Sequence, residues 1–153
     1  MEFFTGLVAN RIFLAAVFGW LSAQVLKTII YMIVNKEFNS ERLFGDGGMP
    51  SSHSATVCAL ATATVYEFGT ASFEFAVTAI LAIIVMHDAM GVRRETGKQA
   101  KAINNMMEWI NQMQRNTTPE ERLKEFVGHS PMQVFFGALL GIFVGIICSA
   151  VIK

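Results

Sequence analysis

The sequence predicts an all-α membrane protein, a polytopic helix bundle with about four transmembrane helices and an inserted pair of peripheral amphipathic helices. Apolar residues make up 53% of its 153 residues, and charged residues only 16%. A soluble domain of this length usually carries about 25% charged residues. The mean hydropathy is +0.45, and the shortage of charge is concentrated in long apolar stretches. We therefore expect one integral membrane domain over residues 1–153.

Four apolar stretches are the expected transmembrane spans. The first contains a single charge, Lys27, and is long enough to cross about 30 Å of hydrocarbon. The second is shorter and rich in Ala, Thr and Ser, small residues that let helix backbones approach closely in lipid. The last contains glycine at every fourth position, as expected on one packed face of a membrane helix. In order, the spans are residues 12–34, 50–66, 73–90 and 131–152, and the glycines are Gly137, Gly141 and Gly145.

A polar insertion, residues 91–129, separates the third and fourth spans. Its apolar residues recur at helical spacing, which predicts one amphipathic helix. Thr118-Pro119-Glu120-Glu121 has the pattern of a capping box with proline at the first helical position, which predicts a second short helix ending near Val127. The apolar face of the first helix consists of Ile103, Met106, Met107, Ile110 and Met113.

The distribution of Lys and Arg predicts the orientation in the membrane. Only Arg11 and Lys153 fall at one face, and nine basic residues fall in the two loops of the other. By the positive-inside rule we expect a multi-pass protein of the cell membrane, with both long loops cytoplasmic and both termini outside. The nine loop residues are Lys36, Arg42, Arg93, Arg94, Lys98, Lys101, Arg115, Arg122 and Lys124.

The stretch Gly45–Ser54, Gly-Asp-Gly-Gly-Met-Pro-Ser-Ser-His-Ser, is a polar loop that leads into the second span. Pro50 suits the first turn of a helix, because its missing N–H would be unpaired there in any case. Ser51, Ser52 and His53 would then surround a helix N-terminus. Free backbone N–H groups and the positive end of the helix dipole favour an anion such as phosphate at that position.

Other unusual polar residues are expected at the same cytoplasmic face. Ionisable groups at a membrane edge are costly and usually functional. Several cations, two histidines at helix starts and one aspartate at one depth indicate a phosphate-processing site. These residues are Lys27, Arg42, His53, Asp88, Arg93, Arg94 and His129.

Three motifs then resemble a known family, the type 2 phosphatidic acid phosphatases (PAP2). Pro50–Ser54 resembles the second PAP2 signature, which contains Pro-Ser-Gly-His, and Gly128–Val134 resembles the end of the third. Asp88–Arg94 is similar to the segment that marks the divergent branch of the family, which is related to acid phosphatases and vanadium-dependent haloperoxidases.

The resemblance implies a role for each matching residue. His129 would be the nucleophile, and His53 would protonate the leaving oxygen. Lys27 and Arg42 would match the lysine and arginine of the first signature, and Arg93 or Arg94 the arginine of the third. No metal or cofactor is implied. Together with Ser51 and Ser52 at the helix N-terminus, these residues form the expected phosphate-binding set.

The chain also departs from the family pattern. Serine replaces the usual glycine at Ser52, 34 residues separate Arg94 from His129, and Gln133 stands where the family has an acid. We hypothesise that Asp88 replaces that acid and fixes the tautomer of His129, as an aspartate does in a catalytic triad.

The expected function is hydrolysis of a phosphate monoester or diphosphate on a lipid or isoprenoid carrier, at the cytoplasmic face, through a phosphohistidine. Two alternatives are a non-catalytic membrane protein that retains a headgroup site and a small oligomeric transporter or scaffold. The net charge is zero, so we expect no nucleic-acid partner. The apolar spans imply a lipid bilayer, and because four short spans make a shallow bundle, we also expect a homo-oligomer. Cys58 and Cys148 lie in apolar stretches and are expected to be core residues.

Overall fold

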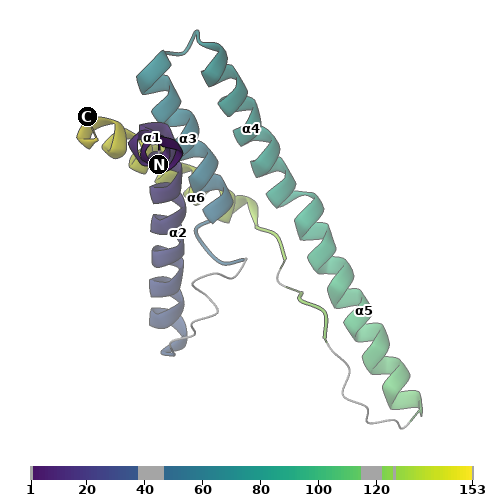
Figure 1. Ribbon diagram of the computed structural model, residues 1–153. Helices are drawn as coiled ribbons and strands as arrows, with labels where there is room; N and C mark the ends of the chain where they lie inside the picture. Colours follow the sequence, from purple (N-terminus) through teal and green to yellow (C-terminus); the bar gives the residue numbers. More distant parts are fainter. Residues whose placement is uncertain (1, 38–46, 115–121, 126, 153) are drawn as a thin grey trace.

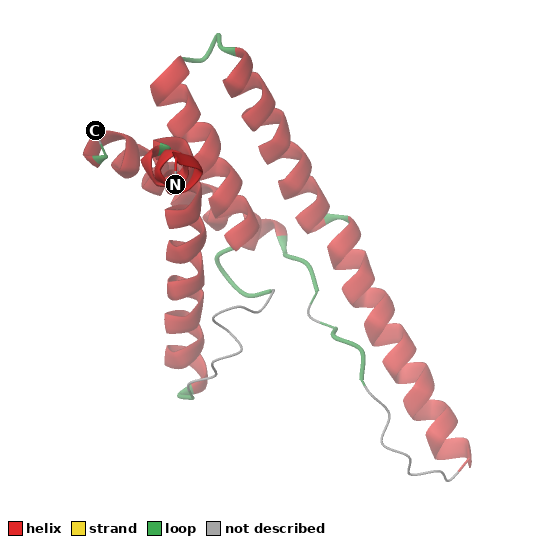
Figure 2. Cartoon of the chain, in the orientation of Figure 1, coloured by secondary structure: helices red, strands yellow, loops and turns green. Residues whose placement is uncertain are grey.

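The computed structural model describes residues 2–37, 47–114, 122–125 and 127–152. Within these residues the chain forms helices and loops without strands (Figure 2). Four helices match the predicted spans to within two residues at each end. The elements are α1 (Glu2–Ala9), α2 (Arg11–Asn35), α3 (Ser52–Phe68), α4 (Phe73–Met90), α5 (Val92–Gln114) and α6 (Pro131–Val151).

Helix α3 is the centre of the bundle, because it contacts α2, α4 and α6 (Figure 1). Its small residues, including Ala55, Ala59 and Ala63, are buried. In lipid no hydrophobic force draws helices together, so close backbone packing of small residues has to hold them. This explains why the least apolar of the predicted spans occupies the interior.

The glycine repeat of α6 packs against α3, as predicted. A methyl group on Gly137 would overlap the carbonyl oxygen of Ser51, and one on Gly141 would overlap that of Ala55. One on Gly145 would come within 2.7 Å of the side chain of Thr62. The absence of a side chain at these three positions therefore sets how closely α3 and α6 approach.

Helix α5 continues out of α4, with a break at Gly91 (Figure 1). The sequence correctly predicts an amphipathic helix here, but not that it extends the third span. The residues that were expected to start the second inserted helix lie outside the described part of the chain.

The described remainder of that expected helix, residues 122–125 and 127, is not helical, so the prediction is wrong there. The backbone N–H of Leu123 donates to Oδ1 of Asn104 at 3.0 Å, and its carbonyl accepts from Nδ2 of the same side chain at 2.9 Å. The Asn104 amide thus replaces the backbone hydrogen bonds that a helical turn would make at this residue.

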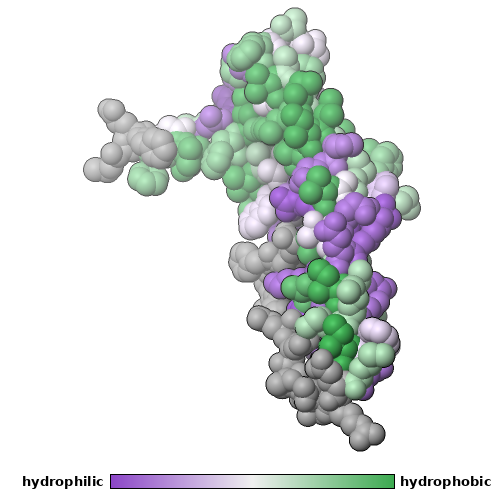
Figure 3. All heavy atoms as spheres, turned by 90° about the vertical axis from the view of Figure 1, so that its right-hand side faces the viewer, coloured by the Kyte–Doolittle hydropathy of each residue, from purple (hydrophilic) through white to green (hydrophobic). Residues whose placement is uncertain are grey.

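Among the residues that the structure describes, three helical runs are long and apolar enough to cross a membrane: α2, the continuous run Phe73–Met113, and α6. Helix α3, with 17 residues, is not among them. Figure 3 shows hydrophobic surface over the upper part of the molecule and hydrophilic side chains gathered below it. The hydrophobic surface includes α4 residues that face outward and are more than half exposed, among them Ile80, Ile83 and Ile84.

Candidate functional site

The N-terminus of α3 is built from the predicted Ser-Ser-His segment. Ser51 is the N-cap, and its Oγ accepts a hydrogen bond from the backbone N–H of Ser54 at 3.3 Å. Pro50 therefore precedes the cap, and its predicted place in the first helical turn is wrong. Ser51, Ser52 and Ser54 are all buried, so three hydroxyl groups surround the positive end of the α3 dipole.

A backbone hydrogen bond joins this terminus to the start of α6. The N–H of Ser51 donates to the carbonyl of Gln133 at 3.0 Å. At the start of α6, Ser130 and Gln133 form a capping box in which each side chain accepts from the other residue's N–H. The N-termini of α3 and α6, which follow two different motifs of the sequence, therefore lie side by side.

The structure brings His53 and His129 together at this junction. Their ring centroids lie 5.9 Å apart in an edge-to-face arrangement with an interplanar angle of 61°. His129 is 3% exposed, whereas His53 is partly buried. Two imidazoles at this spacing lie within reach of one phosphoryl group, because reacting atoms must approach to about 3–3.5 Å.

The segment before His129 is fixed against the junction of α4 and α5. The backbone N–H of His129 donates to the carbonyl of Ala89 at 2.9 Å. Gly128 has a φ of +91°, and a side chain there would overlap the backbone of Arg93 and Arg94. This contact places the backbone of Arg93 and Arg94 beside Gly128, the residue before His129, although 34 residues separate Arg94 from His129 in sequence.

The side chain of Gln133 favours one of the two tautomers of His129. Its Oε1 accepts from the backbone N–H of Ser130 at 2.9 Å, so the atom at that position must be the amide oxygen. The same oxygen lies 3.3 Å from Nδ1 of His129. An amide oxygen only accepts, so this contact is a hydrogen bond when the proton is on Nδ1, and a neutral ring in that form has its lone pair on Nε2. This is the tautomer that a nucleophilic Nε2 requires.

Asp88 does not occupy the orienting role that we hypothesised for it. Its Oδ2 accepts from Nε of Arg93 at 2.8 Å, in an ion pair whose two side chains are 42% and 45% exposed. The contact at Nδ1 of His129 comes from Gln133 instead, which lies four residues later in the first turn of α6. The signal in the sequence was the Ser130–Gln133 capping-box spacing.

Lys27 is buried, at 3% exposure, on the side of α2 that faces Gly48. A Cβ on Gly48 would lie 3.1 Å from Cγ of Lys27, so the lysine stem packs directly on that loop. Gln24 and Thr28 are buried on the same face of α2. The sequence analysis did not select these two residues. Gln24 lies three residues before Lys27 and Thr28 one residue after it, and polar residues so close to an intramembrane lysine indicate a functional site.

Two buried polar atoms have no hydrogen-bond partner among the described residues, Oε1 of Gln24 and Oγ of Ser54. Buried polar groups are normally paired with protein or ordered water, so such atoms usually mark a place where a ligand or water binds. Arg94 is exposed beside the junction, and Arg42 lies outside the described residues. The predicted site residues that meet at the two adjoining helix N-termini are therefore Ser51, Ser52 and His53 at the start of α3 and His129 just before α6.

Comparison with known proteins agrees with these motifs. The chain matches the Divergent PAP2 family over residues 8–144. It is also 41% identical to the uncharacterized membrane protein YuiD of Bacillus subtilis (strain 168) over 145 residues, which cover 89% of this chain and 92% of that protein. No solved structure matches it. The match includes all the residues of the candidate site, and the chain therefore belongs to the Divergent PAP2 family.

Proposed function

We propose that this membrane protein is a metal-independent phosphatase that hydrolyses a phosphate monoester or diphosphate on a lipid or isoprenoid carrier. The observation that carries the proposal is the 5.9 Å approach of His53 and His129 at two adjoining helix N-termini. A nucleophile and an acid on separate helices, with an anion seat between them, are what phosphoryl transfer requires of a protein.

The first chemical step forms a phosphohistidine. Nε2 of His129 bonds to phosphorus while the bond from phosphorus to the carrier oxygen breaks. The protonated ring of His53 gives its proton to that oxygen, so the carrier leaves as a neutral alcohol, or as the lower phosphate if a diphosphate is cleaved. The Gln133 contact at Nδ1 supports this assignment, because it leaves the lone pair on Nε2.

The second step hydrolyses the phosphohistidine. A water oxygen bonds to phosphorus, the electron pair of the nitrogen–phosphorus bond returns to Nε2, and neutral His53 takes a proton from the water. Inorganic phosphate leaves, and both rings regain their starting protonation. The roles of His53 thus alternate between acid and base, as microscopic reversibility requires of such a pair.

Cations and N–H donors stabilise the charge that develops on the equatorial oxygens. The exposed ion pair between Arg93 and Asp88 is worth only about 0–1 kcal/mol, so Arg93 can exchange Asp88 for a phosphate at small cost. Lys27, which is buried against Gly48, would contribute a second positive charge.

The proposed orientation follows the basic residues at the start of α5. Arg93, Arg94, Lys98 and Lys101 lie on α5 beyond the end of α4, so the positive-inside rule assigns this end to the cytoplasm. A carrier chain would remain in the bilayer while its phosphate reached the histidines from the cytoplasmic leaflet.

A phosphate-release assay on the purified full chain in vesicles, with a metal chelator present, tests the proposal. We expect release from an alkyl phosphate at a rate that the chelator does not change. Vanadate should inhibit it, because the anion adopts the geometry of the phosphoryl transition state. Absence of release from both lipid and isoprenoid phosphates and diphosphates would instead favour a non-catalytic headgroup-binding protein.

The variant Gln133→Glu tests the orienting contact. A carboxylate beside Nδ1 favours the imidazolium, so His129 should lose its proton at higher pH. The acid limb of the pH profile of kcat/KM should therefore move to higher pH by about one unit. Glutamate is equally suited to a capping box, so folding should be preserved.

The matched control is Gln99→Glu, which adds the same charge on the exposed face of α5. Its pH profile should stay that of the natural protein. An unshifted profile in Gln133→Glu, or an equal shift in both variants, would remove Gln133 from the orienting role.

A further inference from the structure

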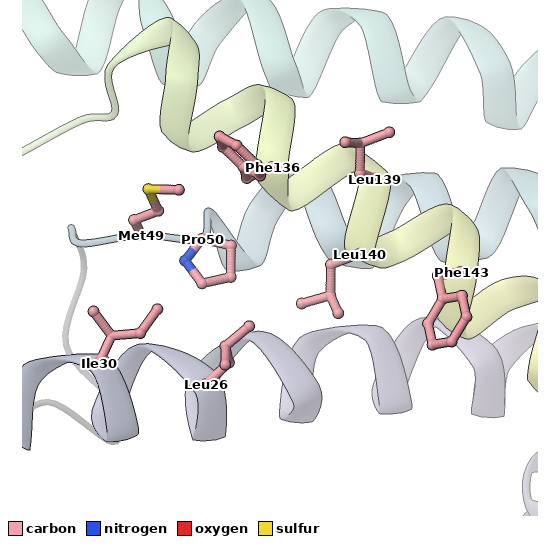
Figure 4. A pocket seen from close by; sticks show the side chains of 8 residues that line it. All are labelled: Leu26, Ile30, Met49, Pro50, Phe136, Leu139, Leu140 and Phe143. Atoms are coloured by element: carbon pink, nitrogen blue, oxygen red, sulfur yellow. The ribbon is translucent and has the colours of Figure 1, made fainter. Parts of the chain in front are cut away.

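An apolar groove runs between α2 and α6 beside the candidate site (Figure 4). Leu26 and Ile30 of α2 form one wall, and α6 forms the other. Pro50 lies between the two walls toward one end of the groove. Its volume is about 320 Å³, within the range of roughly 300–1,000 Å³ typical of ligand sites. The α6 wall includes Phe136, Leu140 and Phe143.

The groove adjoins the phosphate site through the chain itself. Pro50 is followed directly by Ser51, the N-cap of α3, and Leu26 is followed directly by the buried Lys27. On α6, Phe136 is one turn beyond Gln133, which contacts His129. The three segments that line the groove are α2, the loop before α3, and α6. Each of them also contributes a residue to the polar site.

The groove also opens toward the bilayer. Both of its helices are long and apolar enough to cross a membrane. Their groove-lining side chains are partly exposed, with Leu26 at 39%, Phe136 at 39% and Phe143 at 61%. A polar ligand would lose hydration in such a groove without regaining hydrogen bonds. The chemistry of the lining thus selects hydrocarbon.

We propose that this groove holds the hydrocarbon chain of the substrate while its phosphate lies at His53 and His129, an inference that rests on the proposed function. The α6 wall from Phe136 to Phe143 spans roughly 10 Å at 1.5 Å per residue. The groove therefore contacts the part of the chain nearest the phosphate, and the rest extends into the bilayer.

In this proposal, Leu140 is the groove residue that determines whether a hydrocarbon chain fits. Its side chain points from α6 toward Leu26 on the opposite wall, so the two leucines define the width of the groove (Figure 4). A larger side chain at position 140 would fill the groove without touching either histidine.

The first experiment compares Leu140→Trp with Ile142→Trp, which places the same indole on an exposed position of α6 outside the groove. Dodecyl phosphate and ethyl phosphate are the two substrates. In Leu140→Trp, kcat/KM for dodecyl phosphate should fall about tenfold, the size of effect that a pocket misfit of a methylene or more produces. Ethyl phosphate turnover should be kept in both variants, which also shows that they fold.

Equal losses for the two substrates, or equal losses in the two variants, would overturn the proposal. A second readout does not depend on turnover. Dodecyl phosphate carrying a photoactivatable diazirine near its headgroup is crosslinked to the full chain in vesicles, and the labelled residues are mapped by mass spectrometry.

We expect labels on groove residues of α2 and α6 that Leu140→Trp removes and Ile142→Trp keeps. The matching alcohol, which lacks the phosphate, should label them weakly. Equal labelling by the alcohol would make the groove an ordinary lipid-facing surface and overturn the proposal. Groove labelling without phosphate release would refute the proposed function alone, and phosphate release with labels elsewhere would refute the groove alone.

Discussion

His129→Ala is expected to lower phosphate release by at least about a thousandfold, because removing a covalent nucleophile has effects of this size or larger. The residual rate would come from the anion site, which still binds and polarises the phosphate. The measurement is single-turnover release from an alkyl phosphate, together with trapping of a covalent phosphate label that is stable to base and labile to acid. The label should form in the natural protein and be absent from the variant.

His87→Ala is the matched control, since His87 is the remaining histidine of the chain and lies exposed at the end of α4. It should keep both the rate and the label. His53→Ala provides a second comparison: it should lose alkyl phosphate hydrolysis but retain more activity toward p-nitrophenyl phosphate, whose leaving group needs no proton. A His129→Ala protein that still forms the label would assign the nucleophile to another residue.

Gly141→Leu is expected to destabilise the bundle by about 3 kcal/mol or more, at the upper end of the cost of overpacking a tight interface. Even the first carbon of a side chain at this position would overlap the carbonyl oxygen of Ala55. The obstacle is backbone, so it cannot move away as a flexible side chain would. Loss of helical circular dichroism during denaturant titration in detergent micelles measures the change.

Gly6→Leu on α1 is the control, because a Cβ at Gly6 would meet nothing within 4 Å. Leucine is a better helix former than glycine by up to about 1 kcal/mol, so this variant should be neutral or slightly more stable. If Gly141→Leu were as stable as Gly6→Leu, the α3–α6 contact would not be the close packing that the glycine repeat implies.

The membrane helices could be predicted from the sequence because each depends mainly on the residues of its own segment. Lipid forces every backbone polar group to bond within its own helix, so an apolar run of sufficient length sets the bounds of a span almost by itself. The predicted 73–90 and the observed α4 agree at both ends. The glycines of α6 also predict its packing face, because small residues at every fourth position are typical of close helix–helix contacts in lipid.

The insertion was harder to predict because its structure depends on a partner distant in sequence. The capping-box pattern near Thr118 favours a helix, yet the described residues 122–125 instead lie along α5, where Leu123 bonds the side chain of Asn104. A weak local preference of this kind is easily overcome by two well-formed hydrogen bonds. The pattern of residues 118–127 does not indicate that Asn104 is a hydrogen-bond partner of this segment.

The residue types of the site, by contrast, were available from sequence, but their pairing was not. Motifs select His53, His129 and the arginines, because phosphate chemistry needs imidazoles and cations. They do not reveal that Gln133 rather than Asp88 contacts His129. That choice depends on Arg93 bonding the aspartate and on the capping box aiming the amide at the ring.

The sequence by itself therefore determined the membrane helices, the packing glycines and the kinds of side chain at the site, since each follows from local periodicity or composition. Only the tertiary structure decided that the N-termini of α3 and α6 adjoin, that α4 continues into α5, and that an apolar groove lies between α2 and α6. These features arise from the angles and distances at which helices far apart in the chain pack, and no short stretch of residues specifies them.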